Sequence, residues 1–182
     1  MKRLSYWNLL ALRIARSNGV PVPKEVIEKG VAYVNRCRDR GRSMYTYLPA
    51  GSGGRRGPWG HTVQMTACGL LCMMLAGEYD DPTHPMYAQL ILNSARPDGW
   101  VTPADFWNMP GRDVYCLYHA TKALHQLGGS QWEEYAQRIL PGIINRQQKD
   151  GSWNGSVGSA FNTAMHLLCL TAPYEQAPMY QR

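Results

Sequence analysis

Apolar residues recur at the three- and four-residue spacing of an α-helix along most of the chain, whereas the glycine-rich stretches between them lack the alternation of a strand. The pattern predicts seven helices, at about residues 5–18, 23–37, 62–76, 83–94, 113–127, 130–147 and 159–171. Long loops rich in glycine, proline and arginine are predicted over 38–60 and 96–112. We therefore expect an all-α fold without a competing sheet.

The predicted helices carry start and stop residues. Gly77 follows the third helix and favours the left-handed conformation that often ends a helix. Ser130 and Glu133 form a capping box that predicts the start of the sixth helix, and Ser159 predicts the start of the seventh. Pro141, inside the sixth helix, predicts a bend or a break there.

The helices alternate in character along the chain. The second, fourth and sixth predicted helices are amphipathic. The first, third, fifth and seventh are dense in apolar residues and carry a few embedded polar ones: Asn8, Thr66, His119, Asn162 and His166. This alternation predicts an inner layer of buried helices and an outer layer of half-exposed ones.

A short turn pattern occurs three times at intervals of roughly 50 to 60 residues, which indicates a repeat architecture. Its clearest copy is the segment 143–153, Ile-Ile-Asn-Arg-Gln-Gln-Lys-Asp-Gly-Ser-Trp, and weaker copies lie at 95–100 and 37–41. The glycine of each copy can adopt the positive φ that ends a helix. We expect Trp100 and Trp153 to be buried as staples between successive helical hairpins.

The third copy resembles the Gln-Trp repeat of squalene and oxidosqualene cyclases and of the related protein prenyltransferase β subunits, because it keeps Gln147, Gly151 and Trp153. The second copy has Ala95 in place of the glutamine, and the first keeps only Gly41. At the level of single residues, the resemblance is therefore strongest in the last third of the chain.

The resemblance implies that residues 1–182 form a single repeat domain of the α/α-toroid type. Its repeats would cover roughly residues 5–60, 61–110 and 111–157, with a final inner helix at 158–172. Toroids of this family contain about twice as many helices, so we expect an incomplete toroid. Open ends would expose apolar surface and favour a homo-oligomer.

The composition is that of a globular protein. Of the 182 residues, 45% are hydrophobic and 18% charged, which argues against disorder and allows one domain with a core. The longest apolar stretch, 65–76, is too short to span a membrane, and Asn8 and Arg13 interrupt any signal-peptide core. The five cysteines are odd in number and form no Cys-x-x-Cys, which indicates free thiols and a cytoplasmic protein.

The net charge of +6 is concentrated in one loop. Six arginines lie between residues 36 and 56, Arg55 and Arg56 among them, and Asp39 is the sole acid there. Such a loop could bind a diphosphate, an acidic headgroup or nucleic acid, but no nucleic-acid recognition fold accompanies it. We therefore expect a solvated loop, with no nucleic acid among the partners.

The catalytic motifs of the resembled cyclases are missing. The sequence lacks their Asp-x-Asp-Asp acid, and we interpret the pair Asp80-Asp81 as a helix-start signal. It also lacks a Gly-x-Ser-x-Gly and a phosphate-loop sequence. These motifs therefore assign no reaction.

A zinc site, which the prenyltransferases use, would need ligands that are only partly present. Cys116 and His119 lie three residues apart on one helix face, and His166 or Asp113 could supply a third ligand. Because no Asp-x-Cys segment accompanies them, we predict no metal or other cofactor, with zinc as the alternative. If the protein is an enzyme, these four residues are the catalytic candidates.

Aromatic and polar side chains of the inner helices, with two arginines of the basic loop, are the candidates for ligand binding: Trp7, Tyr115, Tyr118, Phe161, Asn162, Arg55 and Arg56. The resemblance implies an apolar or isoprenoid-like small molecule in a central cleft, and whether the protein is an enzyme stays open. The alternatives are a helical-repeat scaffold for a protein partner, with the basic loop steering an acidic one, and a degenerate cyclase relative without chemistry.

Overall fold

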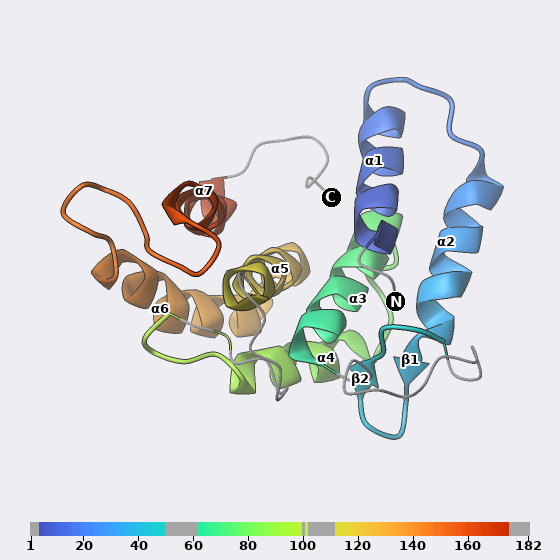
Figure 1. The fold of residues 1–182 in the computed structure, drawn as a ribbon. Coiled ribbons are helices and arrows are strands. Elements are labelled where there is room, and N and C mark those ends of the chain that lie inside the picture. Colours follow the sequence, from blue (N-terminus) through green and yellow to red (C-terminus); the bar gives the residue numbers. More distant parts are fainter. Residues whose placement is uncertain (1–3, 50–61, 100, 102–111, 175–182) are drawn as a thin grey trace.

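The computed structural model describes residues 4–49, 62–99, 101 and 112–174, and it is almost entirely helical there (Figure 1). Its α-helices are α1 Leu4–Ser17, α2 Lys24–Arg36, α3 Val63–Ala76, α4 His84–Asn93, α5 Arg112–Leu127, α6 Gly129–Asn145 and α7 Ser159–Leu170. A 3-10 turn, η1, follows at Ala172–Tyr174, and strands β1 Arg38–Asp39 and β2 Met44–Tyr45 form a hairpin. The predicted all-α class with seven main helices is confirmed.

The helices lie in two rows. Helix α3 packs between α1 and α5, and α5 packs against α7, so these four form one inner row. The outer row consists of α2, α4 and α6, which pack on the inner helices next to them. The rows follow an open arc in the described part of the chain, with the inner row on its concave side (Figure 1). The alternation of apolar and amphipathic helices along the sequence therefore predicted the layers correctly.

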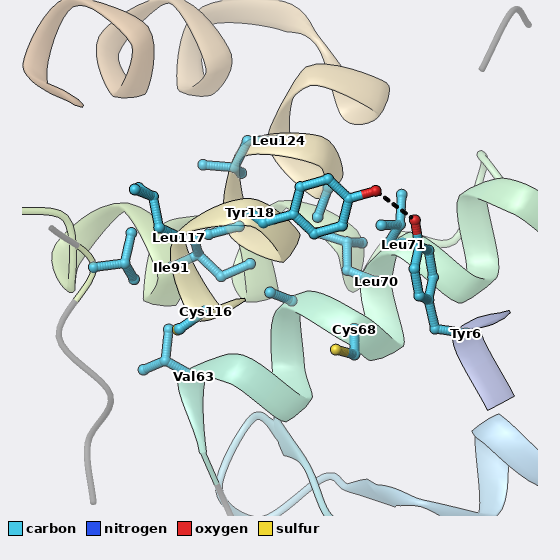
Figure 2. Close-up of a cluster of buried hydrophobic side chains, with 14 of the residues drawn as sticks. Tyr6, Val63, Cys68, Leu70, Leu71, Ile91, Cys116, Leu117, Tyr118 and Leu124 are labelled. Atoms are coloured by element: carbon cyan, nitrogen blue, oxygen red, sulfur yellow. Dashed lines mark hydrogen bonds between the residues drawn. The ribbon is translucent and has the colours of Figure 1, made fainter. Parts of the chain in front are cut away.

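Helix α3 is the centre of the core. It is apolar all round, and every residue from Val63 to Leu75 is buried. The Thr62 hydroxyl accepts a hydrogen bond from the Met65 amide at 2.9 Å, and Gly77 ends the helix at φ 89°. The neighbours of α3 meet across it, because the hydroxyls of Tyr6 in α1 and Tyr118 in α5 are 3.1 Å apart (Figure 2). The inner row therefore curves so that side chains of α1 and α5 meet over α3.

Two helix starts differ from the prediction. Helix α6 begins at Gly129 after Gly128, so Ser130 lies inside the helix and the predicted capping box is wrong. Helix α7 begins at Ser159, but Gly158 is its cap residue and the predicted serine cap is wrong too. The chain enters both helices through a glycine at positive φ, 75° at Gly128 and 105° at Gly158, which residues with a Cβ rarely adopt.

Of the two effects predicted at Pro141, a bend or a break, the break does not occur, because α6 continues through it to Asn145. Pro141 and Gln137, whose carbonyl lacks its usual helical donor there, are both exposed. Water can therefore satisfy that carbonyl, and the proline does not end the helix.

The hairpin of residues 38–45 is the main departure from the predicted absence of sheet. Arg38 pairs with Tyr45 and Asp39 with Met44 in antiparallel register. Strands of two residues are too short to show alternation, so the sequence pattern could not reveal them. The hairpin brings the buried Tyr45 ring onto α3, where a Cβ at Gly69 would be 2.4 Å from it.

The turn before residue 100 and helix α6, far apart in the sequence, touch through backbone rather than through side chains alone. The turn at Gly99, which has φ 80°, rests directly on α6 at Gly142. A Cβ on Gly142 would be 2.3 Å from the Gly99 nitrogen, far inside van der Waals contact. Arg146, one turn further along, donates to the carbonyl oxygens of Asp98 at 2.6 Å and Gly99 at 3.1 Å. These contacts hold the turn at residues 97–99 against α6.

The predicted staple at Trp153 is confirmed. Its indole is buried between α6 and α7, its Nε1–H donates to the Ile143 carbonyl at 2.8 Å, and it stacks on the His166 ring at 5.4 Å. The turn itself is closed by the Gln147 amide, which donates to the Gly151 carbonyl at 2.9 Å. Trp100, the other expected staple, lies outside the described residues.

Candidate functional site

Aromatic side chains from α1 and α5 meet on the inner row. Tyr6 and Trp7 come from α1, and Tyr115, Tyr118 and His119 come from one face of α5, where positions three and four apart are neighbours. We call these five residues the aromatic cluster. The structure therefore brings together four candidates from the sequence, and it adds Tyr6, which only the proximity of the two helices reveals.

His119 lies at the centre of the aromatic cluster and is fully buried. The centroid of its ring is 4.9 Å from that of Tyr6, 4.3 Å from that of Tyr115 and 5.1 Å from that of Tyr118. Its Nδ1 is 2.8 Å from the Tyr115 carbonyl oxygen, which can only accept, so Nδ1 carries the proton of this hydrogen bond. The imidazole is thus held in a fixed orientation by rings and backbone.

Trp7 forms the exposed edge of the aromatic cluster. Its side chain is 44% exposed, yet its Nε1–H donates to the Tyr115 hydroxyl at 2.9 Å. The one polar group of the indole is therefore satisfied within the protein, and the remaining ring surface is apolar. Such a ring can contact an apolar ligand without leaving a donor unpaired.

A buried lysine adjoins the aromatic cluster. Lys122 is 1% exposed, and its Nζ is 5.7 Å from the centroid of the Tyr118 ring, within the range of a cation–π contact. Sequence reasoning missed it, although a lone lysine in an otherwise uncharged stretch of an inner helix was a visible signal. It places a positive charge next to the aromatic rings.

The three catalytic candidates whose side chains the structure describes, Cys116, His119 and His166, do not converge. Cys116 is buried near Tyr135 of α6, and burial, together with Cys169 and Cys116, raises the pKa of that tyrosine. His119 packs on α1 instead. His166 stacks on Trp153, away from both. No group of three or more His, Cys, Asp or Glu is placed to hold a metal among the residues that the structure describes. The Asp113 side chain, Arg55 and Arg56 lie outside that part of the chain.

The two candidates on α7 have different surroundings. Phe161 is 38% exposed. Asn162 is buried, its amide donates to the Gly158 carbonyl at 2.8 Å, and it fills the space that a Cβ at Gly155 would need. Asn162 therefore fixes the entry of the chain into α7, and ligand contact by either residue stays a prediction.

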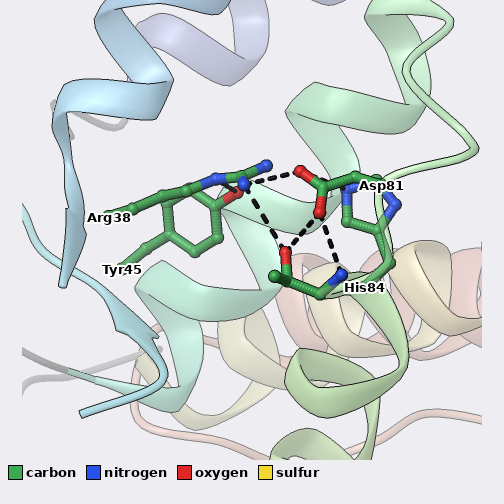
Figure 3. A network of polar contacts seen from close by, with 5 residues as sticks. Arg38, Tyr45, Asp81 and His84 are labelled. Carbon is green, nitrogen blue, oxygen red and sulfur yellow. Dashed lines mark hydrogen bonds and ion pairs between the residues drawn. The ribbon is translucent and has the colours of Figure 1, made fainter. Parts of the chain in front are cut away.

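A second polar site joins the hairpin to the start of α4 (Figure 3). The Arg38 guanidinium donates to the Asp81 carboxylate at 2.6 Å and to the Tyr45 hydroxyl at 2.8 Å. The other carboxylate oxygen accepts from the amide of Thr83 at 2.9 Å and from its hydroxyl at 2.6 Å. His84 is buried beside them, with Nε2 4.0 Å from Asp81. We call these five residues the ion-pair cluster.

The ion-pair cluster corrects two interpretations of the sequence. Arg38 was expected in a solvated basic loop, but its side chain is only 8% exposed and paired with an acid. Asp81 was expected to cap a helix, and instead it binds Arg38 and the residue before α4. Burial by itself raises the pKa of Asp81, but the hydrogen bonds from Thr83 and Arg38 outweigh it and hold that pKa well below its usual range.

Two buried histidines predict a loss of stability in acid. Burial lowers the pKa of His84 and of His166 below the ordinary 6.5, so the unfolded chain binds more protons than the folded one as pH falls through this value. The free energy of unfolding should therefore decrease below about pH 6.5. Each histidine should contribute at most about 1.4 kcal/mol for each pH unit. The depressed pKa of Asp81 adds a further loss below about pH 4.

Urea unfolding at pH 7.5 and pH 5.5 measures this effect. The double variant His84→Gln/His166→Gln should show a smaller difference between the two pH values than the unchanged chain. Equal differences in the two proteins would contradict the assignment to these histidines.

A shallow, open pocket of about 380 Å³ lies where α1 connects to α2, lined by Arg16, Gly19, Val20, Pro21, Val22 and Lys24. None of the candidate ligand-binding residues lines it. The aromatic cluster, which unites most of those candidates, is therefore the stronger candidate site.

The five cysteines are buried thiols that form no disulfide bond, as predicted. None of the described helices combines the length and the apolar character that crossing a membrane requires. Comparison of the chain with models of protein families, with curated proteins and with solved structures found no match.

Proposed function

We propose that the protein is a squalene cyclase/prenyltransferase-like repeat domain that binds an apolar, isoprenoid-like small molecule at the aromatic cluster. The observation that carries this proposal is the half-exposed Trp7 indole, whose N–H is already bonded to Tyr115. A ring held in this way presents an ordered apolar surface on the inner row of helices. Ordered aromatic rings lose little side-chain freedom when a ligand binds.

The surroundings of Trp7 suit binding better than catalysis. The ring of Tyr6 is buried 4.9 Å from that of Trp7, and its hydroxyl shares a hydrogen bond with that of the buried Tyr118, so these tyrosines support the surface rather than react. No group of three or more His, Cys, Asp or Glu side chains that could hold a metal is assembled in the described residues. The proposal is therefore one of ligand binding at the aromatic cluster.

Native mass spectrometry of the protein incubated with farnesol tests the proposal. The unchanged chain should retain farnesol, and Trp7→Ala should bind it at least about tenfold more weakly, since a central aromatic contact contributes more than about 1.4 kcal/mol. Val26→Ala is the control, because Val26 is similarly exposed at 42% but lies on the outer helix α2.

Equal retention by Trp7→Ala and the unchanged chain would contradict the proposed site. Failure of the unchanged chain to retain farnesol would instead favour the second candidate function, a scaffold for an acidic protein partner. The exposed Arg40 between the two hairpin strands is the observation that supports this second candidate.

A further inference from the structure

Arg146, which directly follows α6, joins three segments of the chain through one guanidinium group. Its Nη1 donates to the Asp98 carbonyl at 2.6 Å, and its Nη2 donates to the Gly99 carbonyl at 3.1 Å. The same Nη2 lies 3.1 Å from Nε2 of His166 in α7. A single half-buried side chain therefore connects the end of α6 both to the turn at residues 97–99 and to α7.

The second ring nitrogen of His166 fixes how the imidazole meets Arg146. Its Nδ1 is 2.7 Å from the Asn162 carbonyl oxygen, which can only accept, so Nδ1 carries a proton. In the neutral ring Nε2 then has a lone pair and accepts the hydrogen bond from Arg146. Both nitrogens are engaged, so His166 as it is placed serves as an acceptor for Arg146 and not as the zinc ligand considered from the sequence.

We propose that Arg146 and His166 form an acid-sensitive latch, in which protonation of His166 at Nε2 expels the Arg146 guanidinium and so loosens the turn at residues 97–99. A proton on Nε2 removes the acceptor and places two positive charges 3.1 Å apart. The His166 ring is 1% exposed and stacks on Trp153, whose indole face attracts a cation, so the charged ring stays in place. Arg146 is only half-buried and can reach water, so Arg146 moves and the two turn carbonyls lose their donor.

Groups on the surrounding elements bias the charge of His166 less directly than Arg146 does. The Asp98 side chain acts on Arg146, and its carboxylate is already paired with Arg96 at 2.7 Å. Burial raises the pKa of Cys169 in α7 to about 12, so this thiol stays neutral in mild acid. The other groups act on Cys169 or on one another, or are exposed: Tyr135 of α6, Cys116 and Lys122 of α5, and Tyr174 of η1, which is 81% exposed.

The latch is closed at neutral pH and opens in acid. Burial lowers the pKa of His166 most and Arg146 lowers it further, whereas the hydrogen bond to the Asn162 carbonyl raises it. The net pKa lies below the ordinary 6.5, so His166 is neutral above this value and becomes charged only as pH falls below it. The hydrogen bonds to the turn are therefore present at neutral pH and lost in acid.

An NMR titration of the whole chain, from pH 7.5 downward until His166 is charged, measures the latch. The His166 ring signal is the one missing from the variant His166→Gln. The Gly99 nitrogen shares a peptide group with the Asp98 carbonyl, so its resonance should shift with the same midpoint as the His166 ring while the chain stays folded. In His166→Gln the Gly99 resonance should not move over this range, because the glutamine amide oxygen accepts from Arg146 at every pH.

Arg146→Met tests the other half of the latch. Removal of the neighbouring positive charge should raise the affinity of His166 for a proton at least about threefold. Arg138→Met is the matched control, because Arg138 of α6 also donates to a backbone carbonyl, that of Leu92 at 3.1 Å, and should leave the His166 midpoint unchanged.

Three results would each overturn the proposal. They are equal His166 midpoints in Arg146→Met and the unchanged chain, a Gly99 resonance that does not follow His166, and unfolding of the whole chain before Gly99 moves. If Arg146→Met does not fold, the comparison of Gly99 in the unchanged chain and in His166→Gln decides alone.

Discussion

Replacement of Gly142 by alanine is expected to destabilise the protein by more than about 4 kcal/mol, enough to unfold most domains of this size. The new Cβ would lie 2.3 Å from the Gly99 nitrogen, 2.5 Å from the Pro97 oxygen and 2.6 Å from the Asp98 carbonyl carbon. All three atoms belong to backbone, so no side chain can rotate to make room. The turn and α6 would have to separate.

Gly30→Ala provides the matched control for this prediction. Gly30 is also in the middle of a helix, but its Cβ would meet only the flexible Leu9 side chain, at 2.9 Å. Alanine is also the better helix former by about 1 kcal/mol, so this variant should stay within about 1 kcal/mol of the unchanged chain. Thermal and urea unfolding of both variants measure the difference. Similar stabilities of the two variants would contradict the close backbone contact between Gly142 and the turn at Gly99.

The second large effect is expected for Arg38→Met, which should cost about 2–3 kcal/mol of unfolding free energy. Loss of one partner from a buried ion pair typically costs about 3–5 kcal/mol of unfolding free energy. We expect a smaller cost here, because the Asp81 side chain is 23% exposed and water can solvate its carboxylate. The Tyr45 hydroxyl also loses the Arg38 donor. The hairpin should therefore detach from α4 more readily, which amide hydrogen exchange at Thr46 and Tyr45 would report.

Arg40→Met is the control for Arg38→Met, because Arg40 is exposed between the two strands and should contribute less than about 0.5 kcal/mol. The double variant Arg38→Met/Asp81→Asn should be less destabilised than the sum of the two single variants, since it leaves no unpaired carboxylate. Equal stabilities of Arg38→Met and Arg40→Met would contradict the structural role of the ion-pair cluster.

The helices and their layers could be predicted because the signals for them are local. Apolar spacing revealed each helix. The turn that contains Gln147, Gly151 and Trp153 was visible as well, because these residues and their partners lie close together in the sequence. The two rows could be predicted for the same reason. The pattern of apolar residues in each helix shows by itself whether that helix is buried on all sides or on one side.

The missed features depend on residues that are distant in sequence. Arg38 and Asp81 are 43 positions apart, and neither neighbourhood indicates that they form an ion pair. The contact between Gly99 and Gly142 likewise joins two distant segments, and a glycine inside a helix does not indicate which residues pack against it. Four members of the aromatic cluster, Trp7, Tyr115, Tyr118 and His119, were candidates from the sequence, whereas Tyr6 joins them only through the curvature of the inner row.

The central claim, that the inner row carries an apolar ligand site at Trp7, is tested most directly by photo-labelling with a farnesol analogue that carries a diazirine. The account predicts labelled tryptic peptides 4–13 and 113–122, which contain Trp7 and Tyr115, and loss of this label in excess farnesol. Label confined to α2, α4 and α6, or label that farnesol does not displace, would contradict it.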